Sequence, residues 1–360
     1  MTAELLHPPL TAADPATLPW PPDELESLER CPVCGEPGRQ VLHTGLSDGV
    51  FRCAPGVWTM YRCGNCGSAY LDPRPSERSI GLAYRRYFTH DERPAPEYAQ
   101  LTAYQRVRRA LRNGYLRSRY PAWPSRPAWR IAGPALRLDR TARARLDYAA
   151  RNIPVPRAGA RLLDIGCGGG GFLALARQAG YEVVGLDPDP VALKVASKQG
   201  VAVVQAGLPA TGLKASSFDV ITLSHVVEHL HNPVKGAREL YRLLRPGGLV
   251  WLSTPNIESD GHRIFGRDWR GLECPRHLVL FTPASLAGVL RSAGFAHIAL
   301  HRTMRTSWFD ASLAISEGRD PVTVPHPLLP PALKRLERKT IRNGQRHPEM
   351  NEEMVITARR

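Results

Sequence analysis

The chain has 360 residues and a formal net charge of +15 at pH 7, with 43% hydrophobic and 22% charged residues. This composition is ordinary for a soluble globular protein, and the length allows two or three domains. No apolar run approaches the ~18 residues that a membrane-spanning helix needs. The Pro-rich N-terminus lacks a basic leader followed by an apolar run. We therefore expect a cytoplasmic protein whose residues 1–29 are disordered.

Arginine supplies most of the positive charge, which is concentrated between Arg85 and Arg151. An Arg-favouring genome explains such a composition. Attraction to nucleic acid, to an anionic membrane surface or to a phosphate-bearing substrate explains it equally. Because the segment has no RNA-binding signature, we do not expect a nucleic-acid partner. Peripheral contact with a membrane surface stays open.

Four of the seven cysteines form two C-x-x-C-G pairs, Cys31 with Cys34 and Cys63 with Cys66. Four thiolates with this spacing make a closed tetrahedral zinc site of the ribbon type, which leaves no open position for a substrate. The odd number of cysteines and the lack of an export signal argue against a disulfide framework. We predict a zinc ribbon over residues 30–72 that holds structural zinc, with Cys53 as a small buried residue.

Residues 73–155 form an Arg-rich connector. In "AYQRVRRALRNGYLRSRY", residues 103–120, leucine, valine and tyrosine occupy one side of a predicted helix and arginine the other. Such a helix packs as a cap on a catalytic domain. With the Trp- and Pro-rich loop that follows, it is also suited to a membrane interface. Both interpretations stay open.

Residues 156–304 alternate strand and helix patterns, which is typical of a parallel α/β sheet. A further strand pattern closes the chain in residues 348–360. Residues 305–347 then form a long insertion, which is either a lid or a packing appendage. The predicted strands are 161–165, 181–187, 201–205, 218–223, 248–254, 295–302 and 352–360.

The stretch "LLDIGCGGGGFLALARQAGYEVVGLDPDP" runs an apolar strand into a glycine-rich turn and a helix. Gly166, Gly168 and Gly171 satisfy G-x-G-x-x-G. Asp187 ends the next strand, at a spacing that suits a carboxylate binding two ribose hydroxyls. This skeleton fits either a dinucleotide or S-adenosylmethionine (SAM).

Asp164 distinguishes between the two candidate ligands. It stands at the carboxyl end of the strand, two residues before Gly166. A dinucleotide brings its pyrophosphate to this turn, where a carboxylate would repel it. SAM instead brings an α-ammonium group and carries no phosphate. The pattern D-x-G-x-G therefore favours SAM.

"LLDIGCGGGGFL", "GLDPDP", "FDVITLSHVVEHL" and "LLRPGGLVWLSTPN" resemble the successive motifs of class I SAM-dependent methyltransferases. The resemblance implies an α/β fold with a seven-stranded Rossmann-like sheet and an antiparallel last strand, here preceded by the zinc ribbon and the helical connector. It implies that Asp164 and the glycines line the methionine end of SAM, that Asp187 holds the ribose, and that Leu208 contacts the adenine. Gln205 stands where an acid commonly binds the adenine. The full implied cofactor set is Asp164, Gly166, Cys167, Gly168, Asp187, Pro188, Leu208 and Ser224.

The loop "SHVVEHLHNP" after the fourth predicted strand faces the methyl group in that fold. Its His225, Glu228 and His229 resemble the E-x-x-E-H run of quinone-biosynthesis and small-RNA 2′-O-methyltransferases, in which acid and histidine ligands hold a divalent metal. His225 stands in the first acidic position. His277, in the run after the fifth strand, is the candidate for a further ligand.

Three interpretations of this cluster stay open: a divalent metal site, a metal-free base or substrate contact, and a purely structural role. The catalytic candidates are therefore His225, Glu228, His229 and His277. Arg276 is predicted to orient an anionic substrate group, and His231 to be a solvent-exposed turn residue.

A zinc ribbon before a methyltransferase core resembles the sugar methyltransferases of polysaccharide and natural-product pathways. The resemblance implies O-methylation of a sugar, a glycoconjugate or another small-molecule acceptor. One alternative is C-methylation of a ketosugar-like substrate. The other is an RNA- or protein-directed methyltransferase that uses the zinc ribbon as a binding module.

Overall fold

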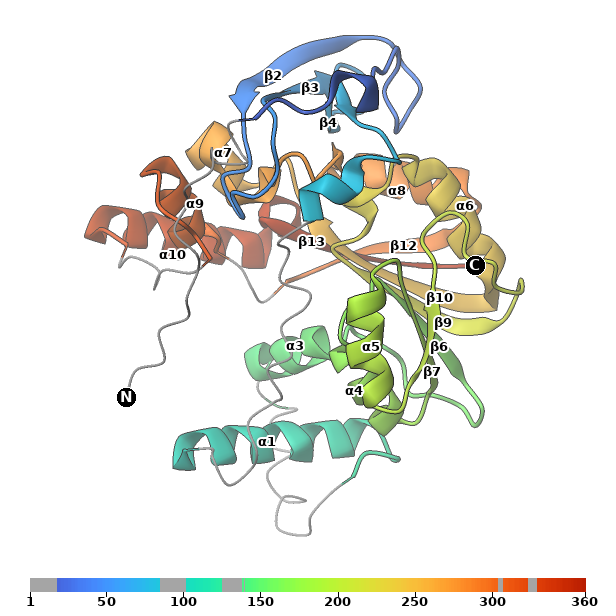
Figure 1. Ribbon diagram of the computed structural model, residues 1–360. Helices are drawn as coiled ribbons and strands as arrows, with labels where there is room; N and C mark the ends of the chain where they lie inside the picture. The colour runs from blue at the N-terminus through green and yellow to red at the C-terminus, as the bar shows by residue number, and fades with distance from the viewer. Residues whose placement is uncertain (1–17, 85–101, 125–137, 139, 304–306, 323–328) are drawn as a thin grey trace, which may run out of the picture.

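The computed structural model describes residues 18–84, 102–124, 138, 140–303, 307–322 and 329–360 (Figure 1). Residues 1–17 of the segment predicted to be disordered lie outside this set. The described remainder of that segment is folded. Trp20 is buried, and β1 (Leu25–Glu26) pairs antiparallel with β5 (Arg74–Pro75). The prediction of disorder is therefore wrong for residues 18–29, because an aromatic side chain anchors them.

A seven-stranded sheet forms the centre of the molecule, with the order β12-β13-β10-β9-β6-β7-β8. The last strand in sequence, β13, pairs antiparallel with both of its neighbours, and the other pairs are parallel. The predicted fold class is confirmed, including the antiparallel last strand. The seven strands are β6 (Arg161–Ile165), β7 (Glu182–Asp187), β8 (Ala202–Gln205), β9 (Phe218–Ser224), β10 (Leu244–Pro255), β12 (Ala296–His301) and β13 (Glu353–Arg359).

Helices cover both faces of the sheet because successive strand residues point to opposite sides. On β6, Leu163 belongs to the core packed under α6 (Pro233–Leu243) and α8 (Pro283–Ser292). Its neighbour Leu162 belongs to the core under α4 (Gly171–Ala179) and α5 (Pro190–Lys198). The parallel strands consequently present their carboxyl ends at one shared edge, where the loops gather.

The N-terminal module has a four-stranded sheet of its own, with the order β11-β4-β3-β2. Its strands are β2 (Arg39–Leu46), β3 (Trp58–Cys63), β4 (Ala69–Leu71) and β11 (Val279–Leu280). The edge strand β11 comes from the methyltransferase part of the sequence. Trp58 and Met60 share a core with Trp269 and Leu280. The module is thus joined to the catalytic part by a strand and by a common core.

The connector supplies α1 (Ala103–Arg119) and α3 (Arg140–Ala149), and the insertion supplies α9 (Phe309–Ser316) and α10 (Pro331–Arg346). The second half of α1 packs on the catalytic core through Tyr115 and Leu116, while Tyr104 in its first turn is 70% exposed. Figure 1 places α1 at the end of the molecule opposite the N-terminal sheet. In the described part of the chain, no helix is long and apolar enough to cross a membrane.

Candidate active site

The turn between β6 and α4 uses glycines where its backbone is left-handed or lies close to a neighbouring loop. Gly166 has a φ of 69°, and a Cβ there would lie 2.5 Å from Cγ2 of Val226. Gly168, with a φ of 50°, donates its amide to Oδ2 of Asp187 at 2.9 Å. The turn therefore lies tightly between the loops after β7 and β9, as a backbone cradle requires.

Asp164 is fully buried at the end of β6. Its Oδ1 accepts a hydrogen bond from Oγ1 of Thr222 at 2.8 Å and pairs with the guanidinium of Arg151. Among the described residues, its Oδ2 has no hydrogen-bond partner. Burial raises the pKa of this carboxyl and Arg151 opposes the rise. The site therefore offers an unsatisfied acceptor, which fits a ligand carrying an ammonium group.

The other predicted cofactor residues surround this turn to different degrees. Both oxygens of Asp187 accept backbone amides, from Gly168 and Asp189. Cys167 is buried, which raises the pKa of its thiol to about 12, so it is a neutral thiol at pH 7. Pro188 continues the loop after β7. Ser224 lies at the end of β9 with its Oγ 3.1 Å from Oγ of Ser253, and Leu208 is half-buried against the core.

His225 is held between two carboxylates. Its Nδ1 donates to Oε1 of Glu228 at 3.1 Å and its Nε2 donates to Oε1 of Glu353 at 3.3 Å. Burial opposes a charged imidazole, but these two hydrogen bonds raise the pKa of His225 to about 10. The two carboxylates therefore favour the charged imidazolium. Its φ of 54° is rare for a residue with a side chain.

Glu228, His229 and His277 bring one ligand atom each to within 4.8 Å of one another. His229 donates from Nδ1 to the Arg276 carbonyl at 2.9 Å, and His277 from Nδ1 to the Gly271 carbonyl at 2.8 Å. Such anchoring of Nδ1 leaves Nε2 as a lone-pair donor, which is the arrangement of metal-bound histidines. Burial lowers the pKa of His277 to about 4 and keeps it neutral. Two imidazole nitrogens and a carboxylate oxygen are a donor set that suits a divalent transition metal.

Two of the predicted roles are wrong. Arg276 is fully buried and binds Asp48 of the N-terminal module and Oε1 of Glu273, so it does not reach a substrate. His231 is half-buried, and its Nε2 lies 2.9 Å from the Pro75 carbonyl. In both cases a segment distant in sequence buries the side chain. The residues next to it in the sequence do not predict that burial.

The structure adds three residues that the sequence reading missed: Arg151, Tyr84 and Glu353. The hydroxyl of Tyr84, at the start of the connector, lies 3.0 Å from Nδ1 of His229. Glu353 begins β13 and is fully buried, although it carries a carboxylate. The sequence "NEEMVITARR" did carry a signal for Glu353, because it places an acid at the first position of an apolar strand. The other two had none.

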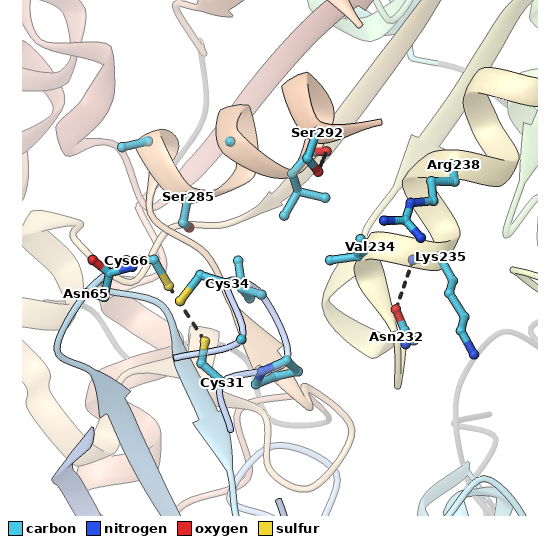
Figure 2. A pocket seen from close by; sticks show the side chains of 16 residues that line it. Cys31, Cys34, Asn65, Cys66, Asn232, Val234, Lys235, Arg238, Ser285 and Ser292 are labelled. Carbon is cyan, nitrogen blue, oxygen red and sulfur yellow. Dashed lines mark hydrogen bonds between the residues drawn. The ribbon is translucent and has the colours of Figure 1, made fainter. Parts of the chain in front are cut away.

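The four cysteine sulfurs of the N-terminal module also gather within 4.8 Å of one another, and Figure 2 shows those of Cys31, Cys34 and Cys66. The Sγ atoms of Cys31 and Cys66 lie 3.7 Å apart, and those of Cys34 and Cys63 lie 3.5 Å apart. Sulfurs around a tetrahedral zinc ion at ~2.3 Å stand about 3.8 Å apart, so the cluster fits zinc. It forms one wall of a groove of about 880 Å³ whose other walls are α6 and α8.

Comparison with known proteins identifies the fold's family. A methyltransferase domain family matches residues 136–300. The ubiquinone biosynthesis O-methyltransferase of Ralstonia nicotianae is 34% identical over 163 residues, which cover 42% of this chain and 68% of that protein. The enzyme of the same name from Cereibacter sphaeroides is 36% identical over 172 residues, 42% of this chain and 70% of that protein. A SAM-dependent methyltransferase structure from Archaeoglobus fulgidus covers 62% of this chain and 94% of its own, with 21% identity and a TM-score of 0.41. The chain belongs to the class I SAM-dependent methyltransferases.

Proposed function

We propose that this methyltransferase transfers the methyl group of SAM to a hydroxyl oxygen of a small-molecule acceptor. The observation that carries the proposal is the cluster of Glu228, His229 and His277. The cluster lies on the loops after β9 and β10, and that after β9 also packs against Gly166. Oxygen needs a group that removes its proton, and histidine side chains are suited to that task. The relatives named O-methyltransferases support the same reaction.

Asp164 and Arg151 are suited to the two charges of the methionine end of SAM. The free Oδ2 of Asp164 would accept from the α-ammonium group, and the guanidinium of Arg151 would bind the α-carboxylate. Asp187 would accept from the ribose hydroxyls in place of one of its backbone donors. These assignments follow from charge complementarity at a buried site.

The chemistry is an in-line displacement in which the acceptor oxygen forms a bond to the methyl carbon while the carbon–sulfur bond breaks. The electron pair of that bond stays on sulfur, which leaves as a neutral thioether. The main task of the enzyme is therefore to position the oxygen. We assign the proton of the hydroxyl to Nε2 of His229, because burial makes His277 a weak base. His225 is an imidazolium that orients Glu228.

A divalent metal at Glu228, His229 and His277 is the second form of this proposal. It would lower the pKa of the acceptor hydroxyl and orient it. Removal of metal with EDTA, followed by Mg²⁺ or Mn²⁺, distinguishes the two forms. Lost activity that Mg²⁺ or Mn²⁺ restores supports the metal. Full activity in EDTA, with bound metal shown to be absent, supports His229 acting alone.

For the acceptor, we propose a ring-bearing molecule of the sugar or glycoconjugate class. The aromatic wall beside the site supports a ring: the Trp308 ring lies 6.3 Å from that of His225 and 5.8 Å from that of Trp269. Trp308 belongs to the segment predicted as an insertion, which supports a lid role for it.

The experiment that tests the acceptor class is incubation with tritiated-methyl SAM and fractionated cell extract. Label in polysaccharide or in sugar nucleotides supports the proposal. Label in phenolic or quinone lipids would instead indicate that this enzyme acts on the acceptor class of the ubiquinone biosynthesis relatives. Label in RNA or protein would contradict a small-molecule acceptor.

We also propose that Cys31, Cys34, Cys63 and Cys66 bind one structural zinc ion. The spacing of their sulfurs supports a closed tetrahedral site.

A further inference from the structure

The C-terminal turn of α3 reaches both halves of the active site. Tyr148 lies in the last turn of α3, and Arg151 lies in the turn that follows the helix, where its φ is 49°. Arg151 contacts the cofactor half and Tyr148 the acceptor half. The turn itself is anchored in the core, because Ala150 and Ile153 are fully buried under α4.

On the cofactor side, the guanidinium of Arg151 pairs with Asp164 and donates to Oγ1 of Thr222 at 3.1 Å. Its Cζ lies 3.9 Å from the ring centroid of Phe172 and 5.5 Å from that of Trp251. An arginine this enclosed has few alternative rotamers. The side chain of Arg151 thus connects Asp164 to the turn that follows α3.

On the acceptor side, the Tyr148 hydroxyl donates to the carboxylate of Glu353, 2.7 Å from Oε2. Glu353 in turn accepts from Nε2 of His225, whose other nitrogen donates to Glu228. A continuous path of hydrogen bonds thus leads from α3 to the loop that carries His229. The register of β13 against β10, with Glu353 opposite Pro255, places the carboxylate at this loop.

Trp251 packs against the α3 end of this path, and the two ends of the path share one backbone feature. Trp251 on β10 lies 6.4 Å from the Tyr148 ring, centroid to centroid, and its Nε1 donates to Oδ1 of Asn152. Arg151, Asn152 and His225 have φ values of 49°, 51° and 54°. Left-handed backbones at residues with side chains store strain and concentrate at functional sites.

We propose that Tyr148 and Glu353 are positioning residues that couple occupancy of the SAM site to the orientation of His225 and the acceptor loop. The inference deepens the proposed function, since it assumes that SAM occupies the Asp164 side and the acceptor the His225 side. When SAM binds, its ammonium group takes the free oxygen of Asp164 and its carboxylate competes for Arg151. The turn of α3 is drawn toward the cofactor, and Tyr148 fixes Glu353 and His225. Acceptor binding is then favoured once SAM is in place, and by linkage the reverse holds.

Hydrogen exchange with S-adenosylhomocysteine (SAH) tests the coupling without any acceptor or turnover. In the wild type, SAH should slow amide exchange over residues 224–231 by about ten-fold, the usual size of such couplings. Tyr148→Phe should lose this protection. Its affinity for SAH by calorimetry should stay within about two-fold of the wild type, since Arg151 and Asp164 are unchanged.

Tyr181→Phe is the matched control. Its buried hydroxyl likewise donates one hydrogen bond, to the Pro154 carbonyl at 2.8 Å, and it has no contact with Glu353. This variant should keep the SAH-induced protection. If Tyr148→Phe fails to fold, Glu353→Gln gives the same readout, because its side chain keeps a single acceptor oxygen and loses the negative charge that pairs with His225.

The outcomes separate the two proposals. SAH binding without protection of residues 224–231 in the wild type overturns the coupling and leaves the methyl transfer intact. The same holds if Tyr148→Phe or Glu353→Gln retains full protection. Failure of the wild type to bind SAH contradicts the cofactor site and with it the proposed function.

Discussion

Asp164 and Asp187 carry the same functional group, but only Asp164 has an oxygen to spare among the described residues. We predict that Asp164→Asn weakens SAM binding by roughly 10- to 100-fold, because a hydrogen bond between charged groups contributes about 1.5–3 kcal/mol. Calorimetry measures the affinity directly. Asp219→Asn is the control, since Asp219 pairs with Arg157 and Arg245 at the opposite end of the strands. Equal affinities in the two variants would contradict the role of Asp164.

Glu352 is a second buried acid whose environment has a measurable consequence. It is 4% exposed and accepts from the indole of Trp269 at 3.0 Å and from the amide of Trp308. Burial raises its pKa from 4.5 to about 7. The folded state therefore holds a proton that the unfolded state has released between pH 4.5 and pH 7. Stability from this group is full below that window and is lost as the pH rises through it.

We predict that Glu352→Gln removes this loss, which amounts to about 3 kcal/mol across the window. Urea unfolding at pH 5 and at pH 8 measures the free energy of unfolding of both proteins. The free energy of unfolding of the variant should increase relative to that of the wild type as the pH rises. Parallel pH profiles would show that Glu352 titrates normally.

At the scale of elements, the strands of the central sheet were predictable and the contacts between elements were not. Each strand is a short apolar run bounded by turns, so its pattern is local and the prediction of seven strands is confirmed. The glycine turn with Asp164 is likewise local. His225 looked like a metal ligand because its second carboxylate, Glu353, lies on the last strand. Strand pairing brings the two together, and a single sequence does not specify that pairing.

Arg276 illustrates the same limit between the N-terminal module and the catalytic part. Its guanidinium and the carboxylate of Asp48 are both fully buried. Asp48 also accepts backbone amides from Phe51, Cys53 and Ala54. The Arg276 guanidinium holds the pKa of Asp48 below its usual value despite burial. This ion pair fixes the loop that leads to His277.

We predict that Arg276→Met destabilises the protein by roughly 3 to 5 kcal/mol, because it leaves the Asp48 charge buried without an opposite charge beside it. Urea or thermal unfolding measures the loss. Arg242→Met removes an exposed arginine from its pair with Glu239 and should cost less than about 1 kcal/mol. A similar cost for the two variants would mean that Asp48 is satisfied by its backbone donors alone.

At the scale of the whole molecule, the N-terminal module is packed on the catalytic part. Strand β11 of the catalytic part completes its sheet, Trp58 and Trp269 share a core, and Asp48 pairs with Arg276. A binding module on a linker would show none of these contacts. This arrangement favours a module that shapes the acceptor pocket over one that recruits RNA or protein.

Zinc binding by the cysteine cluster should therefore affect catalysis indirectly, by stabilising the module that packs on the catalytic part. We predict that Cys34→Ser loses the one zinc ion per chain that elemental analysis should find in the wild type. Because the module and the catalytic part share a core, the loss should lower the midpoint of a single unfolding transition. It should also reduce methyl transfer more than SAH affinity, since Tyr84 and Asp48 contact the acceptor side.

Cys53→Ala changes a buried cysteine outside the cluster and should retain zinc. A wild-type protein without zinc would refute the site, and a separate unfolding transition for the module would refute the shared core.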